Sequence, residues 1–522
     1  MKKAISLALA LVLGTSFFAG CGSKTLSESE ISKKIDTAFS LLDKQKSADL
    51  THTVSMNYDF GSYSYATTTK DEIRETAIGT SKYEMSDDIS ITGMGSTTTY
   101  ETFYKNGWFY TDRYGGKLKT KRDADEVSSA SRDVFFKVTY ADMKTVGLKD
   151  TSLSTGVISD PKEKDALAIS FTCKVGAMKK YIEEAFQSEN RQADDINVTG
   201  GSGEYVLSKS GRLISQSLRI KAGITADGES STVTVSYSTA YKSIDKSVDP
   251  YDPEDKEYTE IESLETAQGL QSALYKSLMM NDINMTAEIT SDITQQKTRA
   301  GYERSYHRIF SGTNKKLLQE VNTKYKSSGK AGADYVSAMY YDGSTYYNRS
   351  DMYQHKIYCQ MDFNTFFTNI YSGAAKTPAD IYLPGMMKDL KSSTAKNGDT
   401  VYTFSLQPSS EQGVDFLEMI FSPYEQFSGD CSTAKVTVNK FSGKCYVNSN
   451  GYYYKTEMSC DLKLQFKEGD IAVKATHDIK IDNIGKATEI KFPKFTGYEK
   501  IDKSDLLSVY NQSASGTSTT GN

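Results

Sequence analysis

The chain carries an internal duplication, and no other feature constrains its fold as strongly. Blocks of sequence in the first half recur in the second half in the same order and at nearly constant spacing. The paired blocks are 37–51 with 272–287, 103–110 with 339–346, 134–136 with 365–367, 185–186 with 420–421, and 205–211 with 446–451. Blocks that stay in register predict two copies of one fold. Their period is the size of a domain, far above the roughly 20–50 residues of a solenoid repeat.

Each copy is predicted to open with an amphipathic helix. In the first copy, apolar residues recur with the helical period at Ile31, Ile35, Ala38, Phe39 and Leu42. Ser27 and Glu30 have the spacing of a capping box at the start of this helix. In the second copy, the same face is formed by Leu270, Ala273, Leu274 and Leu278.

Strands and a further helix follow in each copy. Alternation of apolar and polar residues predicts strands at 285–293 and hairpins at 218–237 and 454–481, each with one dry face. Helical periodicity at 178–186 and 414–421 predicts a helix that interrupts each sheet. We therefore expect the α+β class, with two tandem curved antiparallel sheets that carry their helices on the concave face.

The N-terminus indicates where the protein resides. Lys2 and Lys3 precede an apolar run from Ile5 to Phe18, and Ala19-Gly20-Cys21 follows. This pattern predicts a bacterial lipoprotein signal that is cleaved after Gly20, with a lipid attached to Cys21. The alternative is an ordinary secretory signal with an incidental cysteine. The run is shorter than the roughly 20 residues that span a bilayer, so the lipid is the expected anchor at the extracytoplasmic face of the cell membrane.

Composition shifts predict the domain boundaries. The segment after residue 245 is acidic and contains Pro250 and Pro253, which are unfavourable within helices and sheets. The C-terminal end is rich in Ser, Thr and Gly. The expected parts are a signal peptide at 1–20, a tether at 21–27, domain 1 at 28–245, a linker at 246–261, domain 2 at 262–500 and a disordered tail at 501–522.

Charge and motif content exclude several classes of function. Without Lys2 and Lys3 the chain holds 60 basic and 67 acidic residues, a net charge of −7, which argues against a nucleic-acid partner. The four histidines do not pair at metal-ligand spacing, and His52 and His477 fall in predicted strands, where we expect hydrogen-bonded sheet residues. Nucleophile-elbow and phosphate-loop motifs are absent from the sequence. We therefore expect no metal, no cofactor and no enzymatic activity.

Five cysteines remain after Cys21. Cys173, Cys359 and Cys460 alternate with apolar residues and are expected to be buried thiols. Cys431 and Cys445 flank a predicted strand and are a candidate disulfide in an oxidising exterior, although sequence alone does not determine the pairing.

Tyrosines crowd two stretches, 340–358 and 452–454. Aromatic platforms bind sugars and peptides, but adjacent residues of a strand point to opposite faces of its sheet. Ordinary cross-strand packing is therefore the interpretation that the pattern favours.

The order of elements resembles the LolA/LppX-type lipoprotein fold. The resemblance includes a hairpin motif that reads Tyr104-Lys105-Asn106-Gly107-Trp108-Phe109-Tyr110 in one copy and Tyr340-Tyr341-Asp342-Gly343 with Tyr346 in the other. More closely, the chain resembles uncharacterised surface lipoproteins of Gram-positive bacteria. In this family a curved sheet holds apolar ligands such as acyl chains beneath its helices, so the resemblance implies a lipid or amphiphile as ligand.

The expected function is binding of an apolar or amphiphilic ligand, or of an envelope protein partner, between sheet and helices. The apolar residues expected around such a cavity are Leu41, Leu42, Phe135, Phe136, Phe366, Phe367, Ile420 and Phe421. The same residues are candidates for ordinary core, which is the interpretation that their pattern favours. The alternatives are a scaffolding protein without a small ligand and, less favoured, a hydrolase of envelope polymers.

Overall fold

The structure is a computed structural model. It describes residues 26–506 except 60–63, 94–95, 134–135, 153–164, 189–194, 227–228, 247, 252, 255–256, 279, 296–297, 328–329, 372–376, 422–430 and 468. The predicted signal peptide, Cys21 and most of the C-terminal tail lie outside the described residues.

The chain divides into two compact units. Unit 1 comprises residues 1–107 and 123–252, and unit 2 comprises 108–122 and 253–522. The division differs from the predicted domains at one segment: residues 108–122 fall within the predicted domain 1 but belong to unit 2. A buried leucine accounts for this difference, because Leu118 is part of the hydrophobic core of unit 2.

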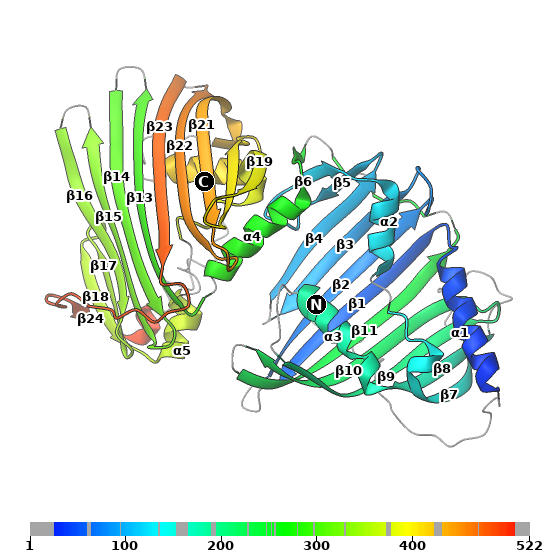
Figure 1. The fold of residues 1–522 in the computed structure, drawn as a ribbon. Helices are drawn as coiled ribbons and strands as arrows, with labels where there is room; N and C mark the ends of the chain where they lie inside the picture. The colour runs from blue at the N-terminus through cyan, green and yellow to red at the C-terminus, as the bar shows by residue number, and fades with distance from the viewer. Residues whose placement is uncertain are drawn as a thin grey trace. The chain divides into compact units, whose positions relative to one another are not determined.

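The first sheet has twelve strands in the order β12-β6-β5-β4-β3-β2-β1-β11-β10-β9-β8-β7. Its strands are β1 (Ala48–Asp59), β2 (Ser64–Thr76), β3 (Glu84–Gly93), β4 (Ser96–Lys105), β5 (Trp108–Thr111), β6 (Leu118–Lys121), β7 (Met143–Ser152), β8 (Asp165–Cys173), β9 (Asp195–Ser208), β10 (Leu213–Ala226), β11 (Glu229–Ile244) and β12 (Thr259–Glu260). Figure 1 shows the long central strands side by side.

The second sheet also has twelve strands, in the order β19-β20-β21-β22-β23-β13-β14-β15-β16-β17-β18-β24. Its strands are β13 (Asp282–Gln295), β14 (Thr298–Ser311), β15 (Lys316–Ser327), β16 (Lys330–Tyr341), β17 (Thr345–Ser350), β18 (His355–Gln360), β19 (Met387–Thr394), β20 (Thr400–Leu406), β21 (Lys435–Val447), β22 (Tyr453–Phe466), β23 (Gly469–Asp482) and β24 (Glu499–Lys500).

The two sheets have the same strand order. When the second order is read backwards, β13 takes the place of β1, β23 that of β11, and β24 that of β12. Most neighbouring strands are antiparallel, but each sheet has one parallel pair, β12 with β6 and β18 with β24. The expectation of purely antiparallel sheets is therefore wrong at this edge, where a short strand beyond the last long strand returns to pair in parallel.

Helices of unit 1 lie on one face of its sheet (Figure 1). They are α1 (Glu28–Leu42), α2 (Ala124–Asp133) and α3 (Lys179–Ser188), with short 3-10 turns η1 (Tyr140–Asp142) and η2 (Val175–Ala177). The predicted capping box is confirmed, because Ser27 Oγ accepts from the Glu30 amide and the Glu30 carboxylate accepts from the Ser27 amide. The predicted apolar face of α1 is buried at Ile31, Ile35, Ala38 and Leu42.

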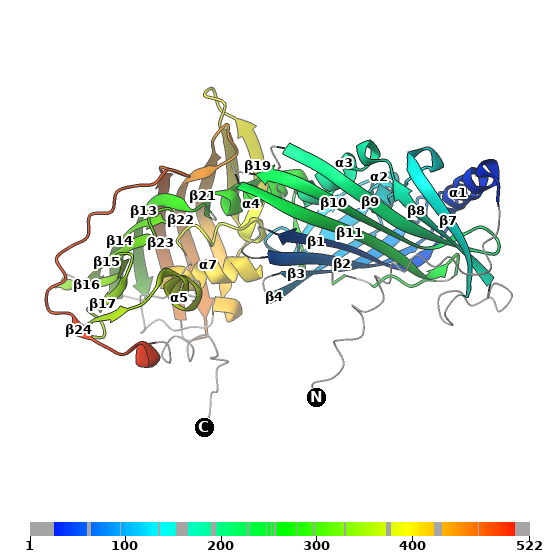
Figure 2. The ribbon, with the colours of Figure 1, turned by 90° about the horizontal axis from the view of Figure 1, so that it is seen from below.

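Unit 2 contains α4 (Leu264–Leu278), α5 (Phe363–Phe366), the π-helical turn η4 (Phe367–Tyr371), the 3-10 turn η5 (Pro384–Met386), α7 (Glu411–Phe421) and the 3-10 turn η7 (Cys431–Thr433). The predicted buried residues of α4 and α7 are confirmed at Leu270, Ala273 and Leu274 and at Leu417, Ile420 and Phe421. Figure 2 shows α5 and α7 on the opposite side of the second sheet from the segment that leads into β24.

Strand alternation agrees with the sequence over most of its length. Met285, Ala287, Ile289 and Ile293 of β13 are all buried, as are the predicted dry positions of β10 and β11. Two predicted dry residues near the ends of β22, Tyr454 and Phe466, are only partly buried, and Tyr453, the neighbour of Tyr454, is buried instead. The β21–β22 register shifts between Tyr446 and Val447, and such a bulge reverses which face the next residues occupy.

The predicted linker at 246–261 contains structure. In unit 1 the Arg74 guanidinium lies over the Tyr251 ring at 4.4 Å from its centroid. In unit 2, Tyr258 is buried against the Tyr110 ring, and Thr259–Glu260 form β12. The predicted tail at 501–522 likewise begins with structure, because Leu506 is buried in the core of unit 2. Both segments thus contribute buried residues, which neither a solvated spacer nor a disordered end would do.

Candidate functional site

Three polar side chains form a row on the dry face of the sheet in unit 1. They are Gln216 on β10, Thr239 on β11 and His52 on β1, and each lies directly opposite the next in the strand register. All three are buried. On β10 the residues that share this face, Leu218 and Ile220, are apolar and buried, so the row places polar groups in an otherwise dry layer.

Hydrogen bonding within this row is incomplete. His52 Nδ1 lies 2.9 Å from Thr239 Oγ1, which satisfies one end of the row. Gln216 is 2 % exposed, and neither its amide oxygen nor its amide nitrogen has a hydrogen-bond partner. A buried polar group without a partner costs about 1–3 kcal/mol. The Gln216 amide therefore offers both a donor and an acceptor inside the protein.

The His52 side chain is uncharged near neutral pH. Burial lowers the pKa of His52 to about 4, because the apolar surroundings disfavour the imidazolium form. A neutral imidazole has one donor and one acceptor nitrogen, so the row presents hydrogen-bonding groups rather than a charge. On β2, Asp71 lies opposite His52 and is only partly buried, which sets a carboxylate at the end of the row nearest to solvent.

A cluster of aromatic side chains lies beside the row. Phe136 lies 6.0 Å from the Tyr205 ring, 6.1 Å from the Tyr237 ring and 6.4 Å from the Tyr181 ring, measured between centroids. Tyr205 stands directly opposite Gln216 on β9, and its hydroxyl accepts from the amide of Val138 and donates to its carbonyl. The Tyr237 hydroxyl donates to the Tyr181 carbonyl. These bonds hold the tyrosines in place beside the row, where the Tyr237 ring lies 6.5 Å from the His52 ring.

In the corresponding row of unit 2, the polar side chain has hydrogen-bond partners. Counted from the β22–β23 turn, Thr456, Ile479 and Ala287 occupy the positions of Gln216, Thr239 and His52. Two of these residues are apolar. Thr456 Oγ1 lies 2.6 Å from the Tyr453 hydroxyl and 3.2 Å from Cys445 Sγ. The two units therefore differ at this point: unit 1 carries an unpartnered amide where unit 2 carries a bonded hydroxyl.

Unit 2 has a single buried imidazole near its core centre, at His477. Its Nδ1 lies 2.8 Å from the Tyr382 hydroxyl, while Nε2 is buried without a hydrogen-bond partner. Burial, and to a lesser extent the charge of Arg304, lowers the pKa of His477 to about 3. The predictions that His52 and His477 are hydrogen-bonded sheet residues are both confirmed.

The predicted cavity residues lie mostly in packed core. Leu42, Phe136, Phe366, Ile420 and Phe421 are buried, and the Phe366 ring stacks on Tyr341 at 4.3 Å. Among them, Phe136 packs against the tyrosines beside the polar row. Phe367 is 42 % exposed, and Leu41 lines a hollow of about 610 Å³ among polar side chains of α1. Phe135 lies outside the described residues.

The sequence interpretation missed Gln216 and Thr239. Both stand in phase with apolar residues of predicted strands, Gln216 two positions before Leu218 and Thr239 two positions after Tyr237. The sequence signal that could have found them is a polar residue at a strand position that otherwise carries apolar residues.

The five cysteines in the described part of the chain are not joined by disulfides. Cys431 and Cys445, the candidate disulfide, are both buried, and no disulfide joins them in this structure. Cys445 instead faces Thr456 across the strand pair, and burial raises the pKa of its thiol to about 12. Cys173, Cys359 and Cys460 are buried thiols, as predicted.

The tyrosine-rich hairpin divides between the two faces of its sheet, as predicted. Tyr341 and Tyr346 pack against Phe366 in the core of unit 2. On the other face, the Tyr347 ring stacks on Phe495 at 3.7 Å, and Tyr340 donates a hydrogen bond to Glu320. These aromatic side chains are engaged within the protein. Tyr353, at the tip of the β17–β18 turn, is 75 % exposed.

Among the described residues, no group of three or more His, Cys, Asp or Glu side chains is placed to hold a metal ion. Within the same part of the chain, no helix is both long and apolar enough to cross a membrane.

No protein-family model and no curated protein matches this chain. Among solved structures, the chain is similar to LprF from Mycobacterium bovis, with 11 % identity over 44 % of this chain and 99 % of LprF, at a TM-score of 0.24. It is also similar to a protein from Bacteroides fragilis, with 8 % identity over 86 % of this chain and 99 % of that protein, at a TM-score of 0.16. At these scores the argument for function rests on the residues of this chain.

Proposed function

We propose that this chain is an envelope lipoprotein that is anchored by a lipid on Cys21 at the extracytoplasmic face of the cell membrane. In this proposal it consists of two copies of a LolA/LppX-like fold, and unit 1 binds an amphiphilic ligand between its sheet and its helices. The shared strand order of the two sheets supports the duplication. The basic start, apolar run and cysteine of residues 2–21 support the anchor.

The single observation that carries the ligand proposal is the unpartnered amide of Gln216. Sites for small molecules are mostly apolar and aromatic, with a few polar groups that fix the orientation of the ligand. Phe136, Tyr181, Tyr205 and Tyr237 supply aromatic walls, and Gln216, Thr239 and His52 supply the polar groups. A neutral ligand head with a donor and an acceptor would satisfy both atoms of the Gln216 amide.

The proposed role is binding rather than catalysis, with no metal or cofactor and no nucleic-acid partner. Unit 2 would then serve mainly as structural support. Its packed aromatic core favours such a supporting role. The Phe366 ring lies nearly parallel to Tyr341 and also contacts Tyr346 and Tyr371. A structural or scaffolding envelope protein without a small ligand is the alternative function, and this role would not depend on Gln216.

Native mass spectrometry of the full chain tests the proposal. The protein would be isolated from its producing cells without delipidation, with Cys21→Ser to remove the anchor lipid from the mass. We expect a bound amphiphile in this protein, a loss of at least tenfold in its occupancy with Gln216→Leu, and no loss with Thr456→Val at the corresponding position of unit 2. An unliganded mass throughout, or an adduct that Gln216→Leu leaves unchanged, would contradict the proposal.

A further inference from the structure

Two turns of unit 2 share a sequence pattern. The β5–β6 turn reads Thr111-Asp112-Arg113-Tyr114-Gly115-Gly116-Lys117, and the β17–β18 turn reads Ser350-Asp351-Met352-Tyr353-Gln354-His355-Lys356. Asp, Tyr and Lys recur at equal spacing. The strands also correspond in the sheet orders, because β5 and β6 occupy the places of β17 and β18.

The first of these turns is docked within unit 2. Tyr114 packs against the hydrophobic core, and the Gly385 amide donates a hydrogen bond of 2.9 Å to the Gly115 carbonyl. A Cβ atom on Gly116 would lie 2.5 Å from the Cα of Gly385, so only glycine permits this approach. The receiving surface is the η5 turn, which directly precedes β19. This turn therefore shows how such a hairpin tip binds a unit of this fold.

The second turn has the same tyrosine but presents it to solvent. Tyr353 is 75 % exposed and Met352 is 53 % exposed. The described contacts of Tyr353 lie inside its own hairpin, where its amide donates to Ser350 Oγ and its ring stacks on His355. Met352 and Tyr353 are neighbours in the chain, so the tip places two large, mostly apolar side chains together in solvent.

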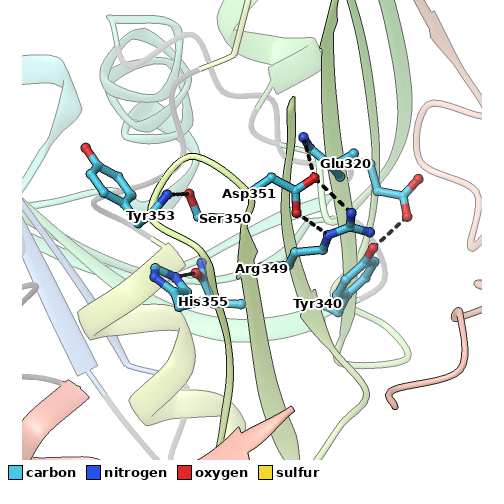
Figure 3. A network of polar contacts seen from close by, with 9 residues as sticks. Glu320, Tyr340, Arg349, Ser350, Asp351, Tyr353 and His355 are labelled. Carbon is cyan, nitrogen blue, oxygen red and sulfur yellow. Dashed lines mark hydrogen bonds and ion pairs between the residues drawn. The ribbon is translucent and has the colours of Figure 1, made fainter. Parts of the chain in front are cut away.

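Polar contacts hold this tip in a defined shape (Figure 3). Arg349 donates to both carboxylate oxygens of Asp351 at 2.8 and 2.9 Å, and the Val336 amide donates to the same carboxylate. His355 Nε2 lies 2.6 Å from the side-chain oxygen of Asn348. A bidentate guanidinium–carboxylate pair restrains the geometry of the turn as well as adding interaction energy. Tyr353 and Met352 are thus presented on a preorganised turn, which lowers the entropic cost of binding.

Unit 1 has an exposed counterpart of the receiving surface. Its η1 turn directly precedes β7, as η5 directly precedes β19 in unit 2. Ala141 in η1 is exposed, and Val175 in the adjoining η2 turn is 46 % exposed. The Lys174 amide donates to the Asp142 carbonyl, so η1 and η2 form one surface.

From this correspondence we propose that the β17–β18 tip of one molecule docks on the η1–η2 surface of unit 1 in a second copy of this chain. Tyr353 and Met352 would pack against Val175 and Ala141, as Tyr114 packs in unit 2. The two surfaces are different, so the contact is head-to-tail and leads to rings or open chains of molecules. Anchoring to a membrane would favour it by raising the local concentration.

Cross-linking between two populations of the full chain tests this proposal. Both would be held on the same lipid vesicles, one with Met352→Cys and the other with Val175→Cys, and joined by a short thiol-reactive reagent. Met352→Cys paired with Tyr275→Cys, at an exposed tyrosine of α4, is the control. We expect a cross-link for the first pair at a yield at least fivefold above the control, and a loss of that excess when Tyr353→Ala is added to the Met352→Cys chain.

Equal yields for the two pairs, or an excess that Tyr353→Ala leaves unchanged, would overturn the proposal. Because Tyr353 is exposed, Tyr353→Ala is expected to leave the fold intact, which circular dichroism would verify. The experiment needs no bound amphiphile, so its outcome is independent of the ligand proposed for unit 1.

Discussion

Replacement of Gln216 by leucine is expected to stabilise unit 1. In the ligand-free protein the wild-type amide is buried with both polar atoms unpartnered. Leucine has a similar volume and no polar atoms, so Gln216→Leu removes the desolvation penalty without leaving a large cavity. The expected gain in the free energy of unfolding of unit 1 is about 1–3 kcal/mol. For a unit of this size each kcal/mol corresponds to about 2–4 °C in Tm.

The matched control is Thr456→Val at the corresponding position of unit 2. Thr456 is hydrogen-bonded to the Tyr453 hydroxyl, so its replacement leaves a buried hydroxyl without this partner. The expected effect has the opposite sign, a loss of about 1–2 kcal/mol from unit 2. Differential scanning calorimetry of delipidated protein, with hydrogen exchange to assign each transition to its unit, would measure both changes. A loss of 1 kcal/mol or more from unit 1 in Gln216→Leu would refute the reasoning.

Four further predictions concern other parts of the chain. Because the folded-state pKa of His52 is about 4, below its unfolded value, unit 1 should lose up to about 3 kcal/mol as pH falls from about 6.5 to 4, and His52→Gln should reduce this loss in urea titrations. Phe366→Ala should lower the stability of unit 2 by about 3–5 kcal/mol, measured by urea unfolding. Gly116→Val should prevent the β5–β6 turn from docking, and amide exchange in β6 should become faster. Cys21→Ser should shift the protein from the membrane to the soluble fraction of cells.

Local features of the fold followed closely from the sequence. The capping box at Ser27 and Glu30 and the alternation of β13 depend on residues a few positions apart, so their patterns are legible in the chain. The order of the repeated blocks likewise corresponds to two sheets with one strand order.

Features that depend on contacts between distant residues could not be predicted from the sequence. The inclusion of 108–122 in unit 2 depends on Leu118 entering a core built from residues far along the chain, and on Gly116 meeting Gly385. Tyr454 was misassigned because the bulge that moves it belongs to the pairing of β21 with β22. Each of these features arises from contacts that a local pattern of polar and apolar residues does not encode.

The polar row illustrates the same division for the candidate site. His52 could be placed in a strand from its neighbours, but its partner Thr239 lies 187 residues away. Phe136 was expected near a ligand, and the structure places it among the tyrosines beside the row. Gln216 differs from its strand neighbours only by being polar. Its significance appears once burial shows that both of its amide atoms are without partners.

A crystal structure of the mature protein, isolated without delipidation and at a resolution that shows ordered water, tests the central claim most directly. We predict density for a molecule larger than water within hydrogen-bond distance of both amide atoms of Gln216, and none at Thr456 in unit 2. A Gln216 amide bonded to the protein's own groups within a filled core would contradict it.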